Sequence, residues 1–421
     1  MLSVYIPWQS RAILVFLMLY LSLYICTMGD IAVIDESKLV DRSLSRIWIK
    51  PYYGSFNGLR GIAVGMVFLC HFGGTLQGYT GNLWVGVDLF FVLSGFLITG
   101  ILYDSLENPH YFRNFYVRRA LRIFPVFYGF FLAVAILTPI LHLHIHWNML
   151  TFVFYFGNLV VPFTNLTAHN PTIIAIVHHG HLMEVGNIGA LWSLCVEEQF
   201  YLIWPAVIWW LRDRKRLMNL CVIVSLMTVT LRFYLYFHAT PIEIEQMILY
   251  WPIYTRCDTL LVGAWLALFL RGHALTQIQL RRMSNCLIWI PLPSLMYILS
   301  RKHGFLRHPF VDTVGFTLIA LVAAGVLLRA IDDDCTLARV LRWHPLSGLG
   351  AISYGVYFIH LIPASPLHRL ADLHPDLSNI IPVLWFFMTV AIAWLSFRFY
   401  ETPFLRLKTV LAPQQSETKA H

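Results

Sequence analysis

Charged residues are scarce in this chain. Lys, Arg, Asp and Glu make up 12% of its 421 residues, whereas 58% of the residues are hydrophobic and the mean hydropathy is +0.65. An average soluble protein carries about 25% charge, so this composition argues against a soluble globular protein. The seven cysteines form no CxxC pair and no zinc-type spacing, and they do not indicate a redox compartment. No internal repeat, low-complexity segment or separate soluble domain is present.

Apolar blocks recur along nearly the whole chain. Several reach the roughly 20 residues needed to cross about 30 Å of hydrocarbon, and most of the others come close. The blocks are residues 11–28, 58–74, 82–103, 120–141, 148–163, 191–211, 217–236, 255–270, 285–300, 311–330, 346–363 and 380–400. The sequence therefore predicts an all-α, polytopic membrane protein.

The distribution of Lys and Arg predicts how these blocks are oriented. Neither residue occurs in 72–102, 142–190 or 234–255, whereas basic residues gather in 104–122, 212–216, 271–282 and the tail. Because short cytoplasmic loops carry the excess of Lys and Arg, we expect the second set of segments in the cytoplasm. Both ends of the membrane core are then cytoplasmic.

This orientation constrains the block at 148–163. The block 120–141 must end outside and the block 191–211 must start outside, so the segment between them cannot be a full crossing. We interpret it as a re-entrant segment, which neighbouring helices must cover. About ten core transmembrane helices result. The connection 301–310, with its basic residues Arg301, Lys302 and Arg307, lies on the unexpected side.

The chain divides into three parts on this interpretation. Residues 1–53 form a leader and polar linker, residues 54–405 the membrane domain, and residues 406–421 a cytoplasmic tail. The block at 11–28 is a candidate extra helix, a signal-like segment, or an unrelated leader added by an upstream start codon, and the sequence does not separate these alternatives.

Ionisable side chains recur at one depth in separate blocks. Arg60 and His71 are eleven residues apart, about three helical turns, so they share a face and lie about 16.5 Å apart along it. The same rise per residue places these residues near the level of His71: Asp88, Glu197, Glu198 and His360, with Arg232, Arg256 and Asp258 close to it. Charges in hydrocarbon are costly, so we expect them to pair around a hydrated cavity. They could serve proton transfer, or only fix helix packing.

A second basic cluster lies at the cytoplasmic end of one predicted span. Arg118, Arg119 and Arg122 fall within about one turn, and arginine forks suit phosphate groups. The preference for basic residues on the cytoplasmic side also accounts for them. The histidine-rich segments 142–146 and 178–181 fit no standard metal-site spacing, so we expect no metal.

Several motifs, taken in order, resemble those of the acyltransferase family 3 membrane proteins, which O-acylate bacterial surface glycans and related acceptors. They are GLR from Gly58 through His71, WVGVDLFFVLSGFLITG from Trp84, RRALRIFP from Arg118, LWSLCVEEQFYLIWP from Leu191, GAISYGVYFIHLI from Gly350, and Glu401-Thr402-Pro403. The resemblance covers about residues 54 to 405. No SGNH-type esterase domain follows, so we expect the stand-alone form of the family.

The resemblance implies an activity and a location. An acyl group, commonly acetyl, would pass from cytoplasmic acyl-coenzyme A to a sugar hydroxyl of an O-antigen, an exopolysaccharide or a lipid-linked glycan, in a bacterial inner membrane. Arg60 and His71 match the pair that the family needs, and Glu197 with Glu198 matches its acidic pair. Arg119 and Arg122, beside Arg118, match its coenzyme-binding motif.

We combine the residues and the resemblance into one hypothesis. His71, oriented by Asp88 or by a glutamate of the 197/198 pair, takes the proton of the acceptor hydroxyl, and His360 belongs to the same catalytic layer. A covalent acyl-enzyme through Ser94, Ser353 or Tyr357 is a variant of this hypothesis. A transporter or flippase would also use a layer of intramembrane charge, although we see no inverted repeat or paired broken helices.

Overall fold

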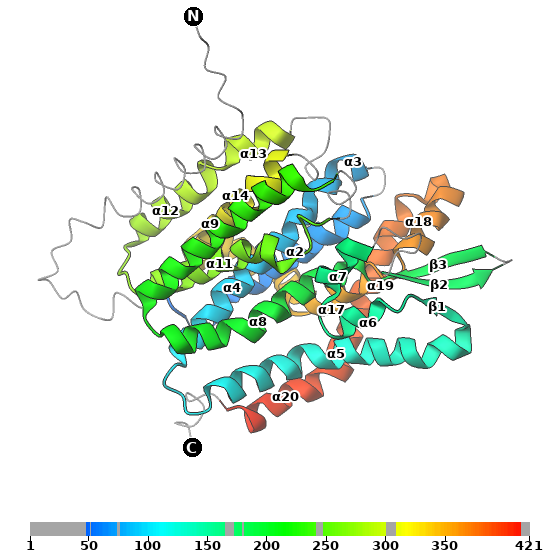
Figure 1. Cartoon of the computed structure of the whole chain (residues 1–421), viewed down its shortest axis with the longest axis horizontal. Helices are drawn as coiled ribbons and strands as arrows, with labels where there is room; N and C mark the ends of the chain where they lie inside the picture. Colours follow the sequence, from blue (N-terminus) through cyan, green and yellow to red (C-terminus); the bar gives the residue numbers. More distant parts are fainter. Residues whose placement is uncertain are drawn as a thin grey trace, which may run out of the picture.

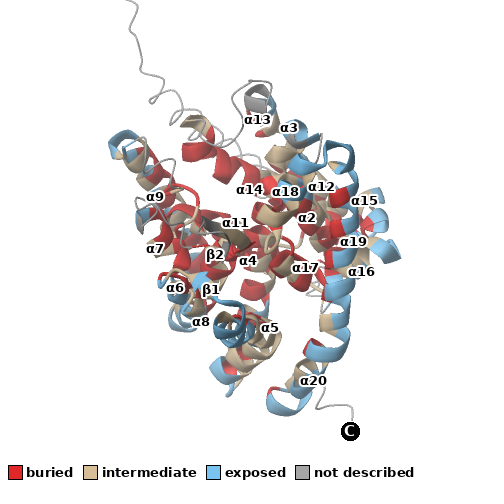
Figure 2. Cartoon of the chain, turned by 90° about the vertical axis from the view of Figure 1, so that its right-hand side faces the viewer, coloured by how far each residue is buried: buried red, intermediate tan, exposed pale blue. Residues whose placement is uncertain are grey.

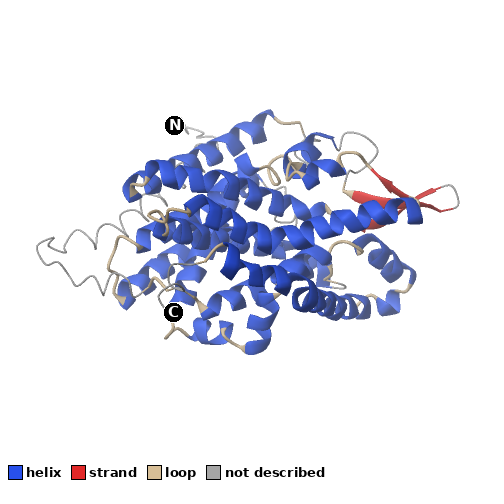
Figure 3. Cartoon of the chain, turned by 90° about the horizontal axis from the view of Figure 1, so that it is seen from below, coloured by secondary structure: helices blue, strands red, loops and turns tan. Residues whose placement is uncertain are grey.

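A computed structural model of the chain describes residues 48–50, 52–73, 76–164, 172–178, 181–240, 247–299 and 309–413. The candidate helix at 11–28 lies outside the described residues, as do Arg301, Lys302 and Arg307 of the unexpectedly placed connection. Helices make up most of the described chain, as Figure 3 shows, so the prediction of an all-α fold is confirmed.

The helices follow the apolar blocks of the sequence. The long ones are α2 (Gly54–His71), α4 (Gly86–Asp104), α5 (Tyr111–Leu141), α8 (Trp192–Leu211), α9 (Arg214–His238), α11 (Ile253–Leu270), α12 (Gln277–Trp289), α14 (Phe316–Ile331) and α19 (Ile380–Leu395). The shorter α-helices are α3 (Gln77–Thr80), α6 (Met149–Val153), α7 (Gly157–Thr164), α13 (Leu292–Leu299), α15 (Thr336–Leu341), α16 (His344–Ala351), α17 (Ser353–Ile359), α18 (Ala364–Leu373) and α20 (Thr402–Leu411). Three elements are 3₁₀-helices: η3 (Gly81–Val85), η4 (Gly189–Leu191) and η6 (Pro375–Leu377). Two are π-helical segments: η5 (Val311–Gly315) and η7 (Ser396–Glu401).

Membrane-spanning helices account for much of this architecture. Six helical stretches among the described residues are long and apolar enough to cross a membrane. They are Gly78–Asp104, Tyr111–Leu141, Arg214–His238, Ile253–Leu270, Val311–Ile331 and Ile380–Leu411. Helices α2 and α8, with 18 and 20 residues, are as long as a span but are not among these six stretches. The protein is therefore a multi-pass membrane protein.

Three of the predicted blocks are broken in the structure. The segment 148–163, which we expect not to cross, forms the two short helices α6 and α7. The block 285–300 is divided between α12 and α13, and the block 346–363 between α16 and α17. Breaks of this kind expose backbone polar groups, which a membrane protein tolerates only where other parts of the protein or water satisfy them.

The core of the protein is built around the close pair α4 and α11. A Cβ atom added to Gly263 would lie 2.0 Å from the Val92 carbonyl oxygen, and one added to Gly95 would lie 1.9 Å from the Leu260 carbonyl oxygen. Glycine at both positions lets the two backbones approach, as small residues do in many membrane helix pairs. Figure 2 shows that buried residues concentrate in the central helices, whereas α20 at the periphery exposes much of its surface.

A small antiparallel sheet lies at one end of the helical body (Figure 1). Its strands are β1 (Leu143–Ile145), β2 (Ile173–His178) and β3 (His181–Asn187), in the order β1-β2-β3. The expectation of an all-α protein includes no strands in this region. The sequence feature that favours a strand here is the run IIAIV at 173–177, whose β-branched residues favour extended backbone.

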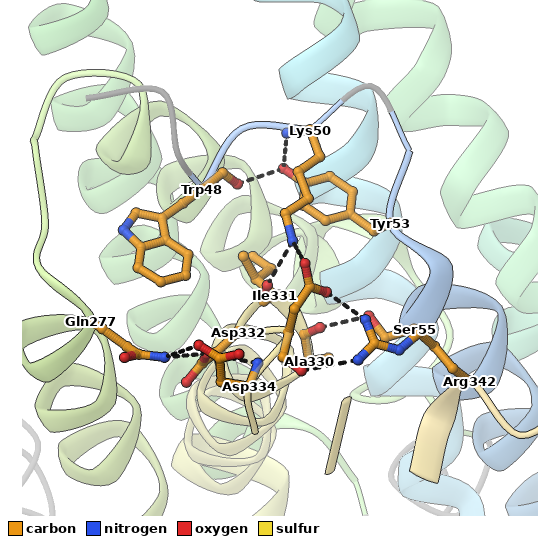
Figure 4. Close-up of polar contacts among 11 residues, drawn as sticks. Trp48, Lys50, Tyr53, Ser55, Gln277, Ala330, Ile331, Asp332, Asp334 and Arg342 are labelled. Atoms are coloured by element: carbon orange, nitrogen blue, oxygen red, sulfur yellow. Dashed lines mark hydrogen bonds and ion pairs between the residues drawn. The ribbon is translucent and has the colours of Figure 1, made fainter. Parts of the chain in front are cut away.

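Polar contacts fix the chain just before α2 (Figure 4). The Lys50 ammonium pairs with the Asp333 carboxylate and donates to the Ile331 carbonyl oxygen at 3.3 Å. The Arg342 guanidinium also pairs with Asp333, at 2.7 Å, and the Ser55 hydroxyl donates to the Ala330 carbonyl oxygen at 2.6 Å. These bonds hold the start of α2 against the connection between α14 and α15, and so help to position Arg60 one to two turns further on.

Candidate functional site

Two cavities inside the protein share three arginines. The inner cavity, of about 90 Å³, lies between α2, α4, α5, α8 and α17. The basic vestibule, of about 650 Å³, lies near the start of α2 and the end of α4. Arg60, Arg119 and Arg122 line both cavities. The three guanidinium groups therefore stand at the junction of the two cavities.

Positive charge dominates the basic vestibule. Its basic lining residues are Lys50, Arg60, Arg118, Arg119, Arg122, Arg271 and Lys408. The carboxylate in the lining belongs to Asp104, which accepts hydrogen bonds from Arg271 Nε at 2.7 Å and Arg271 Nη2 at 2.5 Å. A concave surface with this excess of cations attracts anions.

Helix α5 presents its arginines in two directions. Arg119 and Arg122, three residues apart, line both cavities, as expected for residues that share a helical face. The Arg119 guanidinium also lies 5.0 Å from the ring centroid of Tyr201, within the range of a cation–π contact. Arg118 lines the vestibule but not the inner cavity. Its Nε donates to the Ala412 carbonyl oxygen at 2.7 Å.

A serine and a glutamate meet in the wall of the inner cavity. The Ser94 hydroxyl, near the middle of α4, donates to Glu197 Oε1 on α8 at 2.6 Å. The Tyr201 hydroxyl donates in turn to Ser94 Oγ at 3.1 Å. Glu197 and Tyr201 are four residues apart and so lie on one face of α8. This arrangement places a hydroxyl group, its carboxylate acceptor and a second donor in one cavity wall.

Two more hydroxyl groups meet further along the same cavity. The Tyr357 hydroxyl lies 2.5 Å from Ser193 Oγ and donates to the Ala190 carbonyl oxygen at 2.9 Å. The Tyr357 ring centroid lies 5.4 Å from that of His360. Tyr357 therefore connects the inner cavity to the histidines beyond it.

His71 and His360 form a pair, with ring centroids 5.2 Å apart. His71 Nδ1 lies 2.9 Å from the Val67 carbonyl oxygen, and His360 Nδ1 lies 2.6 Å from the Tyr357 carbonyl oxygen. Because a carbonyl oxygen only accepts, each Nδ1 carries the hydrogen, and Nε2 is the basic nitrogen of each neutral ring. His360 Nε2 is buried and has no hydrogen-bond partner among the described residues.

The predicted contact between Asp88 and His71 is wrong. Asp88 Oδ1 accepts from Arg256 at 2.6 Å, and the neighbouring Arg232 and Asp258 pair at 2.8 Å. All four of these side chains are fully buried. The rise along a helix predicts the depth of a residue but not the neighbour that its face meets, and the α4 face with Asp88 meets α11.

The glutamate pair does not orient His71 either. Glu197 accepts from Ser94, whereas Glu198 lines neither the inner cavity nor the vestibule. The backbone oxygen of Val67 fixes the His71 ring instead. The expected single layer is thus three sites: the histidine pair, the Ser94–Glu197 pair, and the buried ion pairs of Asp88 and Asp258.

Three residues of the site are not predicted from the sequence. Ser193 and Tyr201 lie four residues before and after Glu197, a spacing that places all three on one face and could have identified them. Lys408 on α20 reaches the vestibule from beyond the predicted membrane domain, and no local pattern marks it. Among the residues that the structure describes, no group of three or more His, Cys, Asp or Glu could hold a metal ion.

The fold and the cavities define a polytopic helical membrane protein with a polar site inside its helical bundle. Residues 53–400 match the model of a family described as an acyltransferase domain, so the chain belongs to acyltransferase family 3. No solved structure matches it significantly.

Curated relatives are similar over most of this chain. "Peptidoglycan O-acetyltransferase OatA" of Listeria monocytogenes is 29% identical over 370 residues, which cover 84% of this chain and 56% of that protein. "O-acetyltransferase OatA" of Staphylococcus aureus is 28% identical over 381 residues, which cover 86% of this chain and 58% of that protein. The chain thus spans little more than half the length of these relatives.

Proposed function

We propose that this protein transfers an acyl group, acetyl in the simplest case, from acyl-coenzyme A to a sugar hydroxyl of a cell-surface glycan. The observation that carries the proposal is the junction at Arg60, Arg119 and Arg122, where a basic vestibule opens onto a polar inner cavity. Such a junction suits a donor with a polyanionic end and a reactive end. The family and the names of the curated relatives support the class of reaction.

The vestibule is the proposed site for the phosphates of the coenzyme. Its seven basic side chains include Arg118, Arg119, Arg122 and Lys408, and its carboxylate is already paired. Guanidinium groups bind phosphate through paired N–H donors, and a partly desolvated site strengthens these bonds. The pantetheine arm then carries the thioester past the arginine junction into the inner cavity.

His71 is the proposed general base for the acceptor. Its Nδ1 is fixed by the Val67 carbonyl oxygen, so Nε2 takes the proton of the sugar hydroxyl. His360, whose buried Nε2 has no partner among the described residues, provides a second acceptor or donor beside it. An arginine of the junction, or a hydroxyl donor of the inner cavity, stabilises the oxyanion that forms on the carbonyl of the acyl group.

The acceptor and the location are part of the proposal. Both relatives named above are O-acetyltransferases, and the name of the Listeria protein specifies peptidoglycan. We propose a surface polysaccharide or a lipid-linked glycan as the acceptor, with peptidoglycan, O-antigen and exopolysaccharide as the candidates to compare. The protein lies in a bacterial cytoplasmic membrane, with the basic vestibule facing the cytoplasm, where Lys and Arg are favoured.

The test uses the purified full chain in detergent with radiolabelled acetyl-coenzyme A and each candidate glycan. We expect free coenzyme A to form faster when the correct glycan is present, and an alkali-labile acetyl ester to appear on that glycan. A variant with His71→Ala is the negative control. Glycan movement across liposomes without loss of thioester would contradict the proposal and favour a transporter or flippase.

A further inference from the structure

We propose that Ser94 accepts the acyl group from the coenzyme and holds it as an ester before it passes to the glycan. This inference rests on the proposed function and adds a covalent step within the inner cavity. The Ser94 hydroxyl donates to Glu197 Oε1 at 2.6 Å, in the wall of a cavity that Arg60, Arg119 and Arg122 also line.

The surroundings of Ser94 supply the groups that an acyl-accepting serine needs. Glu197 is positioned to take the hydroxyl proton, because it already accepts that hydrogen bond. The Tyr201 hydroxyl donates to Ser94 Oγ at 3.1 Å and fixes its position. The arginines at the junction provide positive charge for the oxyanion of the tetrahedral intermediate.

Other hydroxyl groups of the cavity lack this combination. The Ser193 hydroxyl contacts the Tyr357 hydroxyl and the Ala190 carbonyl oxygen, and neither of these groups is a strong base. Among the described contacts, Ser353 lines the cavity without a hydrogen bond to a carboxylate. Ser94 is therefore the cavity serine with a general base already in place.

The position of Ser94 also suits a relay between two substrates. It lies near the middle of α4, roughly 12 Å of helix rise from Gly86 and 15 Å from Asp104. Asp104 lines the vestibule, whereas Tyr357 lies beside Phe90, one turn before Ser94 on α4, and contacts His360. An acyl group on Ser94 would thus stand between the donor site and the histidine pair.

The two half-reactions balance. In the first, the Ser94 proton moves to the Glu197 carboxylate, the new C–O bond forms, the C–S bond breaks, and coenzyme A leaves as a thiolate. In the second, the acceptor hydroxyl gives its proton to His71 and attacks the Ser94 ester. The bond between Ser94 Oγ and the acyl carbon breaks, and the departing oxygen takes back the proton held by Glu197. His71 then releases its proton to water.

The experiment is a single-turnover quench of the full chain with acetyl-labelled coenzyme A. Without glycan, we expect up to one acetyl group per chain, located by mass spectrometry on the peptide that contains Ser94. Added glycan should discharge it. In Ser94→Ala we expect no labelled protein and at least a 100-fold lower turnover, and in Glu197→Gln slower labelling. Ser294→Ala, on α13 and in the lining of neither cavity, is the matched comparison and should keep the label.

Two further measurements make the result decisive. If Ser94→Ala does not fold, Ser94→Cys replaces it, and the label should then become a thioester that neutral hydroxylamine removes. Label on another residue, or wild-type turnover by folded Ser94→Ala, would overturn the acyl-serine. Glycan-dependent turnover without any labelled protein would overturn it too, while leaving the proposed function in place. No glycan-dependent turnover by the wild type would instead contradict the proposed function itself.

Discussion

The Asp88 carboxylate lies 2.6 Å from the Arg256 guanidinium, and neither side chain is exposed to solvent. The guanidinium also lies 4.1 Å from the ring centroid of Phe316, within cation–π range. A second buried pair, Arg232 with Asp258, lies between the same central helices. These pairs connect α4, α9, α11 and α14, and they occupy the place where the sequence suggested part of a catalytic layer.

Replacing Asp88 by Ala should destabilise the protein. The change leaves Arg256 as an uncompensated buried cation, which typically costs about 3–5 kcal/mol. We expect a clearly lower apparent Tm of the detergent-solubilised protein. Glu107→Ala, which removes one partner of an exposed pair with Arg212, is the control and should change stability by less than about 1 kcal/mol. An unchanged Tm in Asp88→Ala would show that the buried pair does not hold these helices together.

The arginines of α5 should control the affinity for the donor. Arg119→Ala and Arg122→Ala each remove a charge-assisted hydrogen bond to phosphate, worth about 1.5–3 kcal/mol, so the KM for acetyl-coenzyme A should rise by roughly 10-fold to 150-fold. Steady-state kinetics at saturating glycan measures this. Arg113→Ala is the matched control, because Arg113 lies on the same helix but does not line the basic vestibule. Equal KM values in all three variants would mean that Arg119 and Arg122 only help to orient the helix in the membrane and do not bind the coenzyme.

His71 should affect the chemical step more than binding. His71→Gln keeps a polar side chain but removes the base, so kcat should fall by about 10²-fold to 10⁴-fold with little change in the KM for the coenzyme. His368→Ala is a useful comparison, since His368 lies beside His71: its Nε2 is 3.0 Å from the His71 backbone oxygen, and its ring centroid is 5.3 Å from that of Phe72. A folded His71→Gln protein with wild-type kcat would exclude His71 as the base.

The sequence was sufficient to predict the class of fold and one feature of the candidate site's geometry. Apolar block length predicted the helices, and a three-residue spacing predicted that Arg119 and Arg122 face the same space, as they do. These features depend on local helical geometry. The strands β1 to β3 were not predicted, because the scarcity of basic residues indicates only the side of the membrane, and the β-branched run at 173–177 is too short to distinguish a strand from a helix.

Side-chain partners could not be predicted in the same way. The sequence placed His71, Asp88 and Glu197 at similar depth, but the structure gives them separate partners: the Val67 carbonyl oxygen, Arg256 and Ser94. Which partner a residue meets depends on how each helix is rotated about its axis and on which helices are neighbours. Both properties are set by tertiary contacts such as the α4–α11 glycine contacts.

Replacing Gly263 by a residue with a side chain should destabilise the packing of α4 against α11. The added Cβ would lie 2.0 Å from the Val92 carbonyl oxygen, so Gly263→Ala must push α4 and α11 apart. We expect a loss of about 1–3 kcal/mol, typical of overpacking, seen as a lower apparent Tm. Gly65→Ala is the matched control, because no atom lies within 4 Å of the added Cβ. Similar Tm values for both variants would contradict the close approach.

The contact of Lys50 with Asp333 should make stability depend on pH. The Lys50 ammonium, with support from Arg342, holds the pKa of the Asp333 carboxyl below its usual range. A carboxyl whose folded-state pKa is lowered contributes stability above its unfolded pKa of about 3.9, and this contribution is lost as pH falls through the lower, folded value. Asp333→Asn should therefore lower the apparent Tm at pH 7, and the difference from wild type should shrink as the pH falls below about 4.

Because Asp333 anchors the segment before α2, the same variant should also weaken donor binding at pH 7. A Tm difference that stays constant from pH 7 to pH 3 would mean that the carboxylate charge does not secure this contact.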